Sequence, residues 1–415
     1  MSALTQDLTL DSAALLAQLD ALGAIGADPE RGGRTRLALT DAEKAGRDQL
    51  VDWMRELDLT IAIDQIGNIF GTLPAADGLE RPALMIGSHI DSVANAGALD
   101  GCYGVLGGLA VVRAFRAAGR APGRPITVAA FTNEEGARFQ PDMLGSLVYV
   151  GGLSLQEALD SVATDGARLG DELKQIGYAG EAAPGANPPH AFLELHIEQG
   201  PILEAEGLRI GVVETLQGIS WRRVTIQGSA NHAGTTPIRL RHDAGWAAAA
   251  VTVFLRDLAD ASGGSTLATV GSLRFEPDII NVIARRAVFT VDLRDPDEEK
   301  LQAAERRLDG FLEEIAAKEG LKIRCEQLAR FEPVRFDPDL VAEVEAAARR
   351  FGVSHRRMTS GAGHDAQMIA RIAPSAMIFV PSVGGVSHNP REHTDPADLI
   401  LGAELLLDVA LRCLD

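Results

Sequence analysis

Short apolar runs that alternate with helical patterns restrict the fold of this chain more than any other feature. Each run is followed at once by Gly and polar residues, which is typical of buried strands in an α/β layer fold. A separate helical pattern follows most of the runs. We therefore expect strands at 83–90, 126–132, 192–197 and 376–380, and helices at 105–118 and 340–351.

The middle of the chain has a different pattern. Three segments there alternate apolar and polar residues like half-exposed strands, at 221–228, 268–275 and 287–294, around helical patterns at 242–261 and 297–319. This predicts a separate α+β insert at 215–330, which leaves a discontinuous first domain made of 1–214 and 331–415. A chain of 415 residues is long enough to form two such cores. The Pro/Gly-rich stretch 182–189 predicts a surface loop.

Composition excludes several classes of partner. The 39 Lys and Arg against 58 Asp and Glu give a net charge of −19, which disfavours nucleic acid and anionic lipid. No apolar run approaches the roughly 20 residues of a membrane-spanning helix. The N-terminus lacks a secretion signal, so we expect a cytoplasmic protein. The three cysteines show no CxxC pairing, so a metal would need His and carboxylate ligands.

Histidines and carboxylates cluster where the predicted strands end. His89 is followed by Asp91, and Asp100 precedes the next helix; taken alone, these could equally be capping or turn residues. The adjacent Glu134 and Glu135 follow the second strand and could form a solvated acidic loop. His196 lies at the end of the third strand and His388 follows the fourth, each close to a Gly-containing segment.

Together these clusters predict a metal site, because ligands bind beyond the carboxyl ends of strands in open α/β sheets. Adjacent carboxylates repel one another unless a cation lies nearby, so we expect one Glu on a metal and the other acting as general base. Asp91 is expected to orient the imidazole of His89 from behind. The ligands for two Zn²⁺ or Mn²⁺ ions, with Co²⁺ or Ni²⁺ as alternatives, are then His89, Asp100, Glu135, His196 and His388.

Two further segments are candidates for the site. His232 lies among small residues in 228–237 and could polarise a carbonyl, or simply belong to a turn. Ser360 and Gly361 precede His364 in a Gly-rich segment whose backbone N–H groups could approach an anion. A Gly-rich helix start is the alternative for that segment.

Several ordered blocks resemble one known family. GSHIDS, LDGCYGVLGGL, FTNEEGARF, HIEQGP, ANHAGTTP, INVIARRAVFTVDLRD, SGAGHDA and VSHNPRE are similar to blocks of the hydantoinase/carbamoylase branch of the M20-like metallohydrolases. The branch includes N-carbamoyl-L-amino-acid hydrolases, β-ureidopropionases and allantoate amidohydrolases. The resemblance runs from about residue 30 to the C-terminus.

The resemblance implies a dinuclear centre. His89, Asp100 and His196 would hold one metal, and Asp100, Glu135 and His388 the second, with Asp100 bridging. Glu134 would be the catalytic base. His232 would bind and polarise the substrate carbonyl, either in its own subunit or across a subunit interface. The implied substrate-binding residues are Gln199, Asn281, Arg294, Ser360 and Gly361.

The family's inserted domain acts as a lid and dimerisation module, so the resemblance also implies a homodimer. Two departures stand out: Ala96 replaces a common Gly, and 283–286 replaces a common Pro-Gly turn with a segment containing Arg285 and Arg286. These arginines could bias the pocket towards anions, but we expect them to face solvent.

The expected function is hydrolysis of the carbamoyl C–N bond of N-carbamoyl-L-amino acids by a metal-bridged water, which releases amino acid, carbon dioxide and ammonia. Allantoate and N-carbamoyl-β-alanine are alternative substrates, since both also carry ureido and carboxylate groups. A peptidase or deacylase is disfavoured by His196, because many M20 peptidases have an acidic ligand there. A non-catalytic protein that binds a ureido metabolite is a remote alternative.

Overall fold

A computed structural model describes residues 8–414. The chain divides into two compact units, Met1–Glu214 with Phe336–Asp415, and Thr215–Arg335. The expected insert ended at 330. The second unit ends at Arg335 because a short strand, Val334–Arg335, still pairs with residues 215 and 216.

The first unit contains most of a mixed sheet whose strand order is β1-β2-β4-β3-β5-β14-β6-β12, with β13 paired to β6. The strand β12 and the last two residues of β6 belong to the second unit. Its four central strands, β4, β3, β5 and β14, are parallel, and the flanking pairs are antiparallel. The strands are β1 (Thr60–Ile63), β2 (Ile69–Leu73), β3 (Leu84–His89), β4 (Ile126–Phe131), β5 (Ala191–Ile197), β6 (Ile210–Leu216), β12 (Val334–Arg335), β13 (His355–Ser360) and β14 (Ser375–Val380). Every residue of the four central strands is buried, which explains why these strands are largely apolar.

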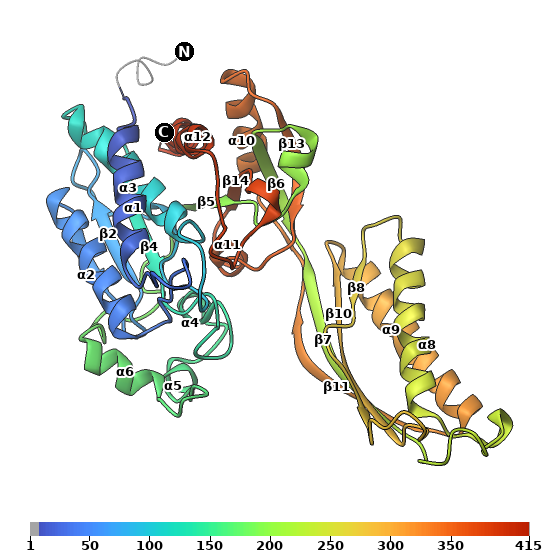
Figure 1. Ribbon diagram of the computed structural model, residues 1–415. Coiled ribbons are helices and arrows are strands. Elements are labelled where there is room, and N and C mark those ends of the chain that lie inside the picture. The colour runs from blue at the N-terminus through green and yellow to red at the C-terminus, as the bar shows by residue number, and fades with distance from the viewer. Residues whose placement is uncertain (1–7, 415) are drawn as a thin grey trace. The chain divides into compact units, whose positions relative to one another are not determined.

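Helices cover both faces of this sheet. Leu195 of β5 lies under α3 and α12, whereas Glu194 on the opposite face contacts the first turn of α11. This alternation along β5 places apolar packing on one face and polar groups on the other. The helices are α1 (Ser12–Ala24), α2 (Asp41–Glu56), α3 (Cys102–Ala117), α4 (Leu144–Tyr149), α5 (Leu155–Leu159), α6 (Leu169–Ile176), α7 (Ile202–Glu206), α10 (Pro338–Arg350), α11 (Asp365–Ile369) and α12 (Pro396–Cys413), with a 3₁₀ turn η2 (Val383–Gly385) (Figure 1).

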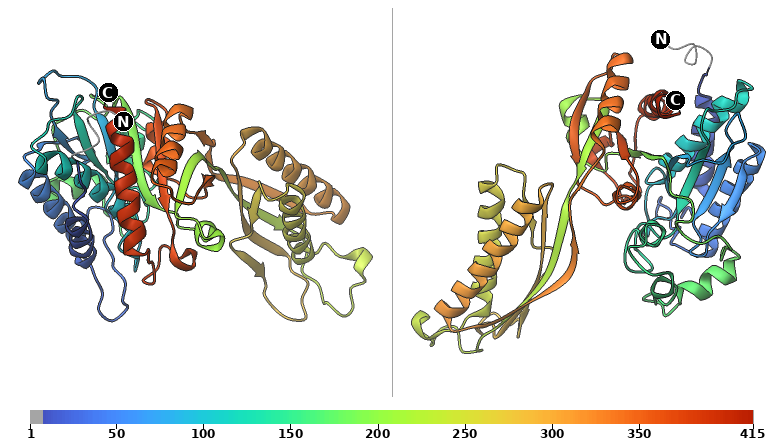
Figure 2. Two further views of the ribbon diagram at one scale, coloured as in Figure 1. Left: turned by 90° about the horizontal axis from the view of Figure 1, so that it is seen from above. Right: turned by 180° about the vertical axis from the view of Figure 1, so that it is seen from behind.

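The second unit packs two long helices on one face of an antiparallel sheet (Figure 2). Its strand order is β11-β7-β10-β8, with β9 also paired to β10. Buried and half-buried residues alternate along β10, so one face of that strand contributes to the core under the helices. The elements are β7 (Gly218–Gln227), η1 (Ile238–Leu240), α8 (Ala244–Ala261), β8 (Leu267–Thr269), β9 (Leu273–Glu276), β10 (Arg286–Asp295), α9 (Glu298–Glu319) and β11 (Lys322–Phe331).

The prediction of one continuous strand at 268–275 is wrong. Thr269 pairs with Asp292, and Leu273 pairs with Phe289. The chain therefore advances four residues from Thr269 to Leu273, while the opposing part of β10 advances only three. This one-residue excess is a β-bulge centred on the Gly271 segment, and it divides the expected strand into β8 and β9.

Both mixed α/β architecture and the positions of the main elements otherwise agree with the sequence patterns. Within residues 8–414, no helix has both the length and the apolar character needed to cross a membrane.

Candidate metal centre

The four parallel strands end at the same edge of the sheet. His89, the last residue of β3, is level with Phe131 at the end of β4, and His196 near the end of β5 is level with Phe379 of β14. Because parallel strands share a carboxyl edge, the segments that follow them meet there. This brings together His89, His196 and residues 132–135 and 381–392, which are distant in the sequence.

Asp100 lies at the centre of this edge. Its Oδ1 is 3.2 Å from His196 Nε2 and 3.6 Å from His89 Nε2. Its Oδ2 is 3.1 Å from His388 Nε2, which in turn is 3.2 Å from Glu135 Oε2. The structure thus brings all five expected ligands together in two groups that share Asp100: His89, Asp100 and His196, and Asp100, Glu135 and His388.

The hydrogen bonds of His89 and His196 indicate which ring nitrogen of each faces Asp100. Nδ1 of His89 is 3.0 Å from the Asp91 carbonyl oxygen, and Nδ1 of His196 is 2.8 Å from the Ile197 carbonyl oxygen. A carbonyl only accepts, so each Nδ1 carries a proton, and Nε2 is the ring nitrogen that faces Asp100. In the neutral form of each ring Nε2 has a lone pair that can bind a cation, so the residues present fit two divalent metal ions.

The charges around the site agree with that fit. Burial alone would lower the pKa values of His89 and His196, but the surrounding carboxylates raise both. Hydrogen bonding to Asp100 and Glu135 raises the pKa of the half-exposed His388 to about 10. Oε1 of Glu135 is buried and has no hydrogen-bond partner within the described part of the chain. The site therefore strongly favours positive charge, and Glu135 Oε1 remains available as an acceptor or ligand atom.

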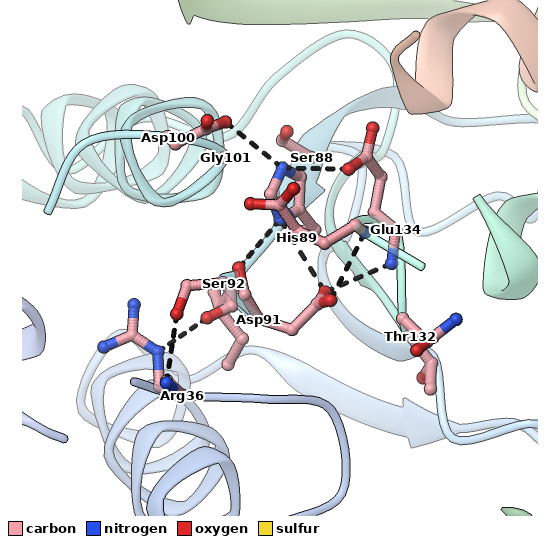
Figure 3. Close-up of polar contacts among 12 residues, drawn as sticks. Arg36, Ser88, His89, Asp91, Ser92, Asp100, Gly101, Thr132 and Glu134 are labelled. Atoms are coloured by element: carbon pink, nitrogen blue, oxygen red, sulfur yellow. Dashed lines mark hydrogen bonds and ion pairs between the residues drawn. The ribbon is translucent and has the colours of Figure 1, made fainter. Parts of the chain in front are cut away.

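Glu134 and Asp91 lie beside the first group (Figure 3). Glu134 Oε2 is 3.4 Å from His89 Nε2. The Asp91 carboxylate accepts hydrogen bonds from the backbone N–H groups of Glu134 (3.2 Å) and Glu135 (3.3 Å), and its Oδ1 is 3.7 Å from His89 Nδ1. Asp91 was expected to orient the imidazole. In the structure its backbone oxygen makes the close contact with the ring, and its carboxylate holds the Glu134–Glu135 backbone.

Burial raises the pKa of Glu134 well above its usual range, and the neighbouring Asp365, Glu135 and Asp100 carboxylates raise it further, although His89 opposes them. A carboxyl group with a raised pKa can both accept and return a proton near neutral pH. This property suits a general base that later acts as an acid.

Gln199 also contacts Asp100. Its Nε2 donates to Asp100 Oδ2 at 2.7 Å, and its buried Oε1 has no hydrogen-bond partner within residues 8–414. One end of the amide therefore orients the shared carboxylate, and the other end offers an acceptor.

The expected anion-binding turn lies at the end of β13. Ser360 Oγ accepts from the Ala362 N–H at 3.2 Å and lies 2.9 Å from His364 Nε2, so its hydroxyl stabilises the turn. A Cβ added at Gly361 would meet open space. His364 is buried against the ring of His196, with centroids 4.5 Å apart, and burial holds its pKa well below the usual range. A further group of potential metal ligands, which the sequence did not indicate, consists of Glu194, His196 and His364.

His232, Asn281 and Arg294 belong to the second unit. The first two lie on adjacent exposed segments, where the Ala233 N–H donates to the Asn281 carbonyl at 2.9 Å. Arg294 lies on β10, where its guanidinium is paired with Asp292 at 2.9 Å. A Cβ at Gly234 would lie against the His232 ring.

The two arginines of 283–286 pair with one carboxylate. Arg286 and Arg285 lie 2.6 and 3.2 Å from the two oxygens of Glu276. Both arginines are at least 40% exposed. They therefore join the start of β10 to the end of β9 and also face solvent.

Arg36 supports the site, although the sequence did not indicate it. This fully buried guanidinium donates to the carbonyl oxygens of Ile90 (2.6 Å) and Leu22 (2.7 Å) and contacts Cys102 Sγ (2.9 Å). The Arg36 N–H donates to Ser92 Oγ at 3.0 Å (Figure 3). It thus joins the turn after His89 to the helix that follows Asp100, contacts that sequence spacing could not have revealed.

The parallel strand ends of this mixed α/β fold carry two His/carboxylate groups around a shared aspartate, which are candidate ligands for a dinuclear site of the kind found in metal-dependent hydrolases. Known proteins agree: the profile of the Peptidase family M20/M25/M40 matches residues 85–412. The chain belongs to this family.

Individual relatives and a solved structure show which members of the family the chain is similar to. The chain is 41% identical to the N-carbamoyl-L-amino-acid amidohydrolase of Rhizobium meliloti, over 92% of this chain and 91% of that protein. It is 35% identical to the allantoate amidohydrolase of Escherichia coli, over 93% and 94%. The crystal structure of an amidase of the hydantoinase/carbamoylase family from Burkholderia multivorans superposes with a TM-score of 0.94, at 43% identity and 98% coverage of both chains.

Proposed function

We propose that this protein hydrolyses the carbamoyl C–N bond of N-carbamoyl-L-amino acids and releases the amino acid, carbon dioxide and ammonia. One observation carries the proposal: Asp100 is shared by two His/carboxylate groups, and the Glu134 carboxyl lies beside them. The names of relatives such as the Rhizobium meliloti enzyme support the choice of substrate.

The chain's own residues supply binding and proton transfer. His89, His196 and Asp100 would hold one cation, and Asp100, Glu135 and His388 the other; Zn²⁺ and Mn²⁺ suit these donors. When bound, the cations supply Lewis-acid polarisation and make water a competent nucleophile near neutral pH. Glu134 accepts the proton of the attacking water and returns it to the leaving nitrogen.

The remaining expected residues have proposed roles in substrate binding. Arg294 binds the substrate carboxylate, because a guanidinium matches a carboxylate with two parallel hydrogen bonds, and Asn281, Ser360 and Gly361 contribute to the same group. Gln199 Oε1 accepts from the ureido N–H. His232 polarises the scissile carbonyl. Within this proposal Thr215–Arg335 is the lid and dimerisation domain and the remainder is the catalytic domain.

Allantoate is the second candidate substrate. It carries the same ureido and carboxylate groups, and the Escherichia coli allantoate amidohydrolase is 35% identical to this chain. The same residues would serve either reaction, since the chemistry at the carbonyl is unchanged.

The test is ammonia release by chelator-stripped protein reconstituted with Mn²⁺, Zn²⁺ or Co²⁺. We expect N-carbamoyl-L-amino acids to give the highest kcat/KM among three substrates, the others being N-carbamoyl-β-alanine and allantoate. Preference for allantoate would keep the mechanism and change the substrate. Metal-dependent turnover of none of the three would overturn the proposed function.

The proposal includes a homodimer formed through the second unit. Large apolar side chains are exposed there on α8, at Trp246 and Val253, and on the edge strands, at Leu267, Leu273 and Phe275. Exposed apolar groups of this kind are typical of a subunit interface. Sedimentation should give a dimer for the wild type and a monomer for Val253→Asp; a monomeric wild type would refute the assembly.

A further inference from the structure

The segment that carries Asp100 is held by a residue from the other end of the chain. Residues 90–101 connect β3 to α3 and contain neither helix nor strand. Within this segment the backbone N–H groups of Leu99 and Asp100 donate to Glu392 Oε1, at 2.8 and 3.3 Å. Glu392 is the last residue of the VSHNPRE block, and the proposed reaction gives it no role.

The second oxygen of Glu392 completes a ring of contacts. Ser387 Oγ lies 2.9 Å from Glu392 Oε2 and 3.1 Å from Asp100 Oδ2. Ser387 directly precedes His388, whose Nε2 is 3.1 Å from the same Asp100 oxygen. Glu392 therefore contacts the backbone of one expected ligand and the immediate neighbour of another.

Packing leaves Glu392 little freedom to move. A Cβ added at Gly97 would overlap the Glu392 side chain, including its carboxylate, closer than carbon atoms can approach. The Glu392 side chain thus packs against the Gly97 backbone, while its carboxylate accepts the N–H groups of Leu99 and Asp100. His388 itself is 47% exposed and has a φ of 52°, so its own packing does little to hold its position.

We propose that Glu392 is a positioning residue that sets the separation of Asp100 and His388, and so builds the second cation subsite of Asp100, Glu135 and His388. The inference rests on the proposed dinuclear function. The first subsite depends less on Glu392, because His89 and His196 are held by their own strands and by the carbonyls of Asp91 and Ile197. Loss of Glu392 should therefore weaken cation binding at the second subsite more than at the first.

Three variants of the full-length protein separate geometry from charge. Glu392→Ala removes all of these contacts. Glu392→Gln keeps an oxygen for the Leu99 and Asp100 N–H groups and offers an amide to Ser387, so it preserves the geometry without the charge. Glu204→Ala is the matched control, because Glu204 Oε2 accepts the Gly384 N–H at 2.7 Å and also holds the segment after β14, at its other end.

The measurement is Mn²⁺ binding to chelator-stripped protein, with free Mn²⁺ followed by electron paramagnetic resonance. We expect two sites in the wild type, in Glu204→Ala and in Glu392→Gln. In Glu392→Ala one site should weaken by about 10- to 100-fold, as is typical when a residue supporting a metal ligand is lost. Ser387→Ala should weaken the same site to a smaller extent, and it replaces Glu392→Ala if that variant does not fold.

The outcomes distinguish this inference from the proposed function. Fewer than two Mn²⁺ sites in the wild type would refute the dinuclear proposal itself. Two sites in the wild type with unchanged binding in folded Glu392→Ala, or equal weakening of both sites, would overturn the positioning role. If Glu392→Gln behaves like Glu392→Ala, charge and not geometry is what Glu392 supplies, and the inference is also wrong.

Discussion

At the scale of single residues, neighbouring side chains of the same type have different surroundings. Glu134 and Glu135 are adjacent, and the Asp91 carboxylate accepts both of their backbone N–H groups. Their side chains nevertheless reach different histidines: Glu134 lies near His89 and Glu135 near His388. The different positions of these carboxylates predict different consequences for the same substitution.

Glu134→Gln should lower kcat by about 100- to 10,000-fold and leave both metal sites intact, because it removes proton transfer but no ligand. Glu135→Gln should also weaken the site that contains His388. Turnover and Mn²⁺ binding, measured side by side, check this pair. Metal loss in Glu134→Gln would mean that Glu134 is itself a ligand.

Asp64 should make the stability of the protein depend on pH. This buried carboxylate accepts the N–H groups of Ile66 and Asn68. The Asn68 side-chain oxygen in turn accepts the N–H of Thr132, two residues before Glu134. Burial raises the pKa of Asp64 to about 6. An unfolded Asp titrates near 3.9. The native state therefore binds the proton more tightly, so this contribution to stability is present below about pH 4 and is lost as pH rises through about 6.

The free energy of unfolding of the wild type relative to Asp64→Asn should accordingly fall by about 2 kcal/mol between pH 4 and pH 7. Urea denaturation at several pH values measures the difference. Asp77→Asn is the control, since exposed Asp77 accepts the Leu79 N–H in a similar turn and its pKa is lowered. A difference that rises with pH would contradict the assignment for Asp64.

At the scale of elements, the site depends on how α3 begins. Gly101 precedes this helix with a φ of 65°, and a Cβ there would overlap the ring of His89. Gly119 follows the same helix with a φ of 61°, but a Cβ there would meet open space. Both glycines therefore have a positive φ, but only at Gly101 would a Cβ overlap a neighbouring side chain.

Gly101→Ala should displace His89 and lower kcat by about 100-fold or more, because misplacement by about 1 Å is enough for such a loss. Gly119→Ala should cost only the strain of a left-handed alanine, about 1 kcal/mol of stability, with kcat unchanged. Steady-state kinetics and thermal unfolding of both variants provide the check. Equal kcat in the two variants would show that the His89 ring can move aside without loss.

At the scale of the whole molecule, every expected metal ligand lies in the first unit. The tryptophans are divided differently: Trp53 lies in α2 of the first unit, and Trp221 and Trp246 lie in the second. Fluorescence can therefore follow each unit separately.

Chelation should destabilise the first unit, because a ligand at 100 times its dissociation constant contributes about 2.7 kcal/mol. A Trp221→Phe/Trp246→Phe variant, which reports through Trp53, should unfold at lower temperature after chelation. A Trp53→Phe variant should show little change in the second unit. Equal shifts in both would mean that the units unfold as one cooperative body.

The sequence by itself determined the mixed α/β class, the main strands and helices, and the five expected ligands, which form two groups that share Asp100. It could do so because buried parallel strands are continuously apolar, and because side chains that follow such strands must lie at one edge. Local patterns, however, carry no information on contacts between distant segments. Only the tertiary structure placed Glu392 on the backbone of Leu99 and Asp100, Arg36 beneath the turn after His89, and the Asp91 carboxylate on the Glu134 and Glu135 N–H groups. The bulge between β8 and β9 was likewise decided by pairing with β10, since the register of a strand belongs to the pair.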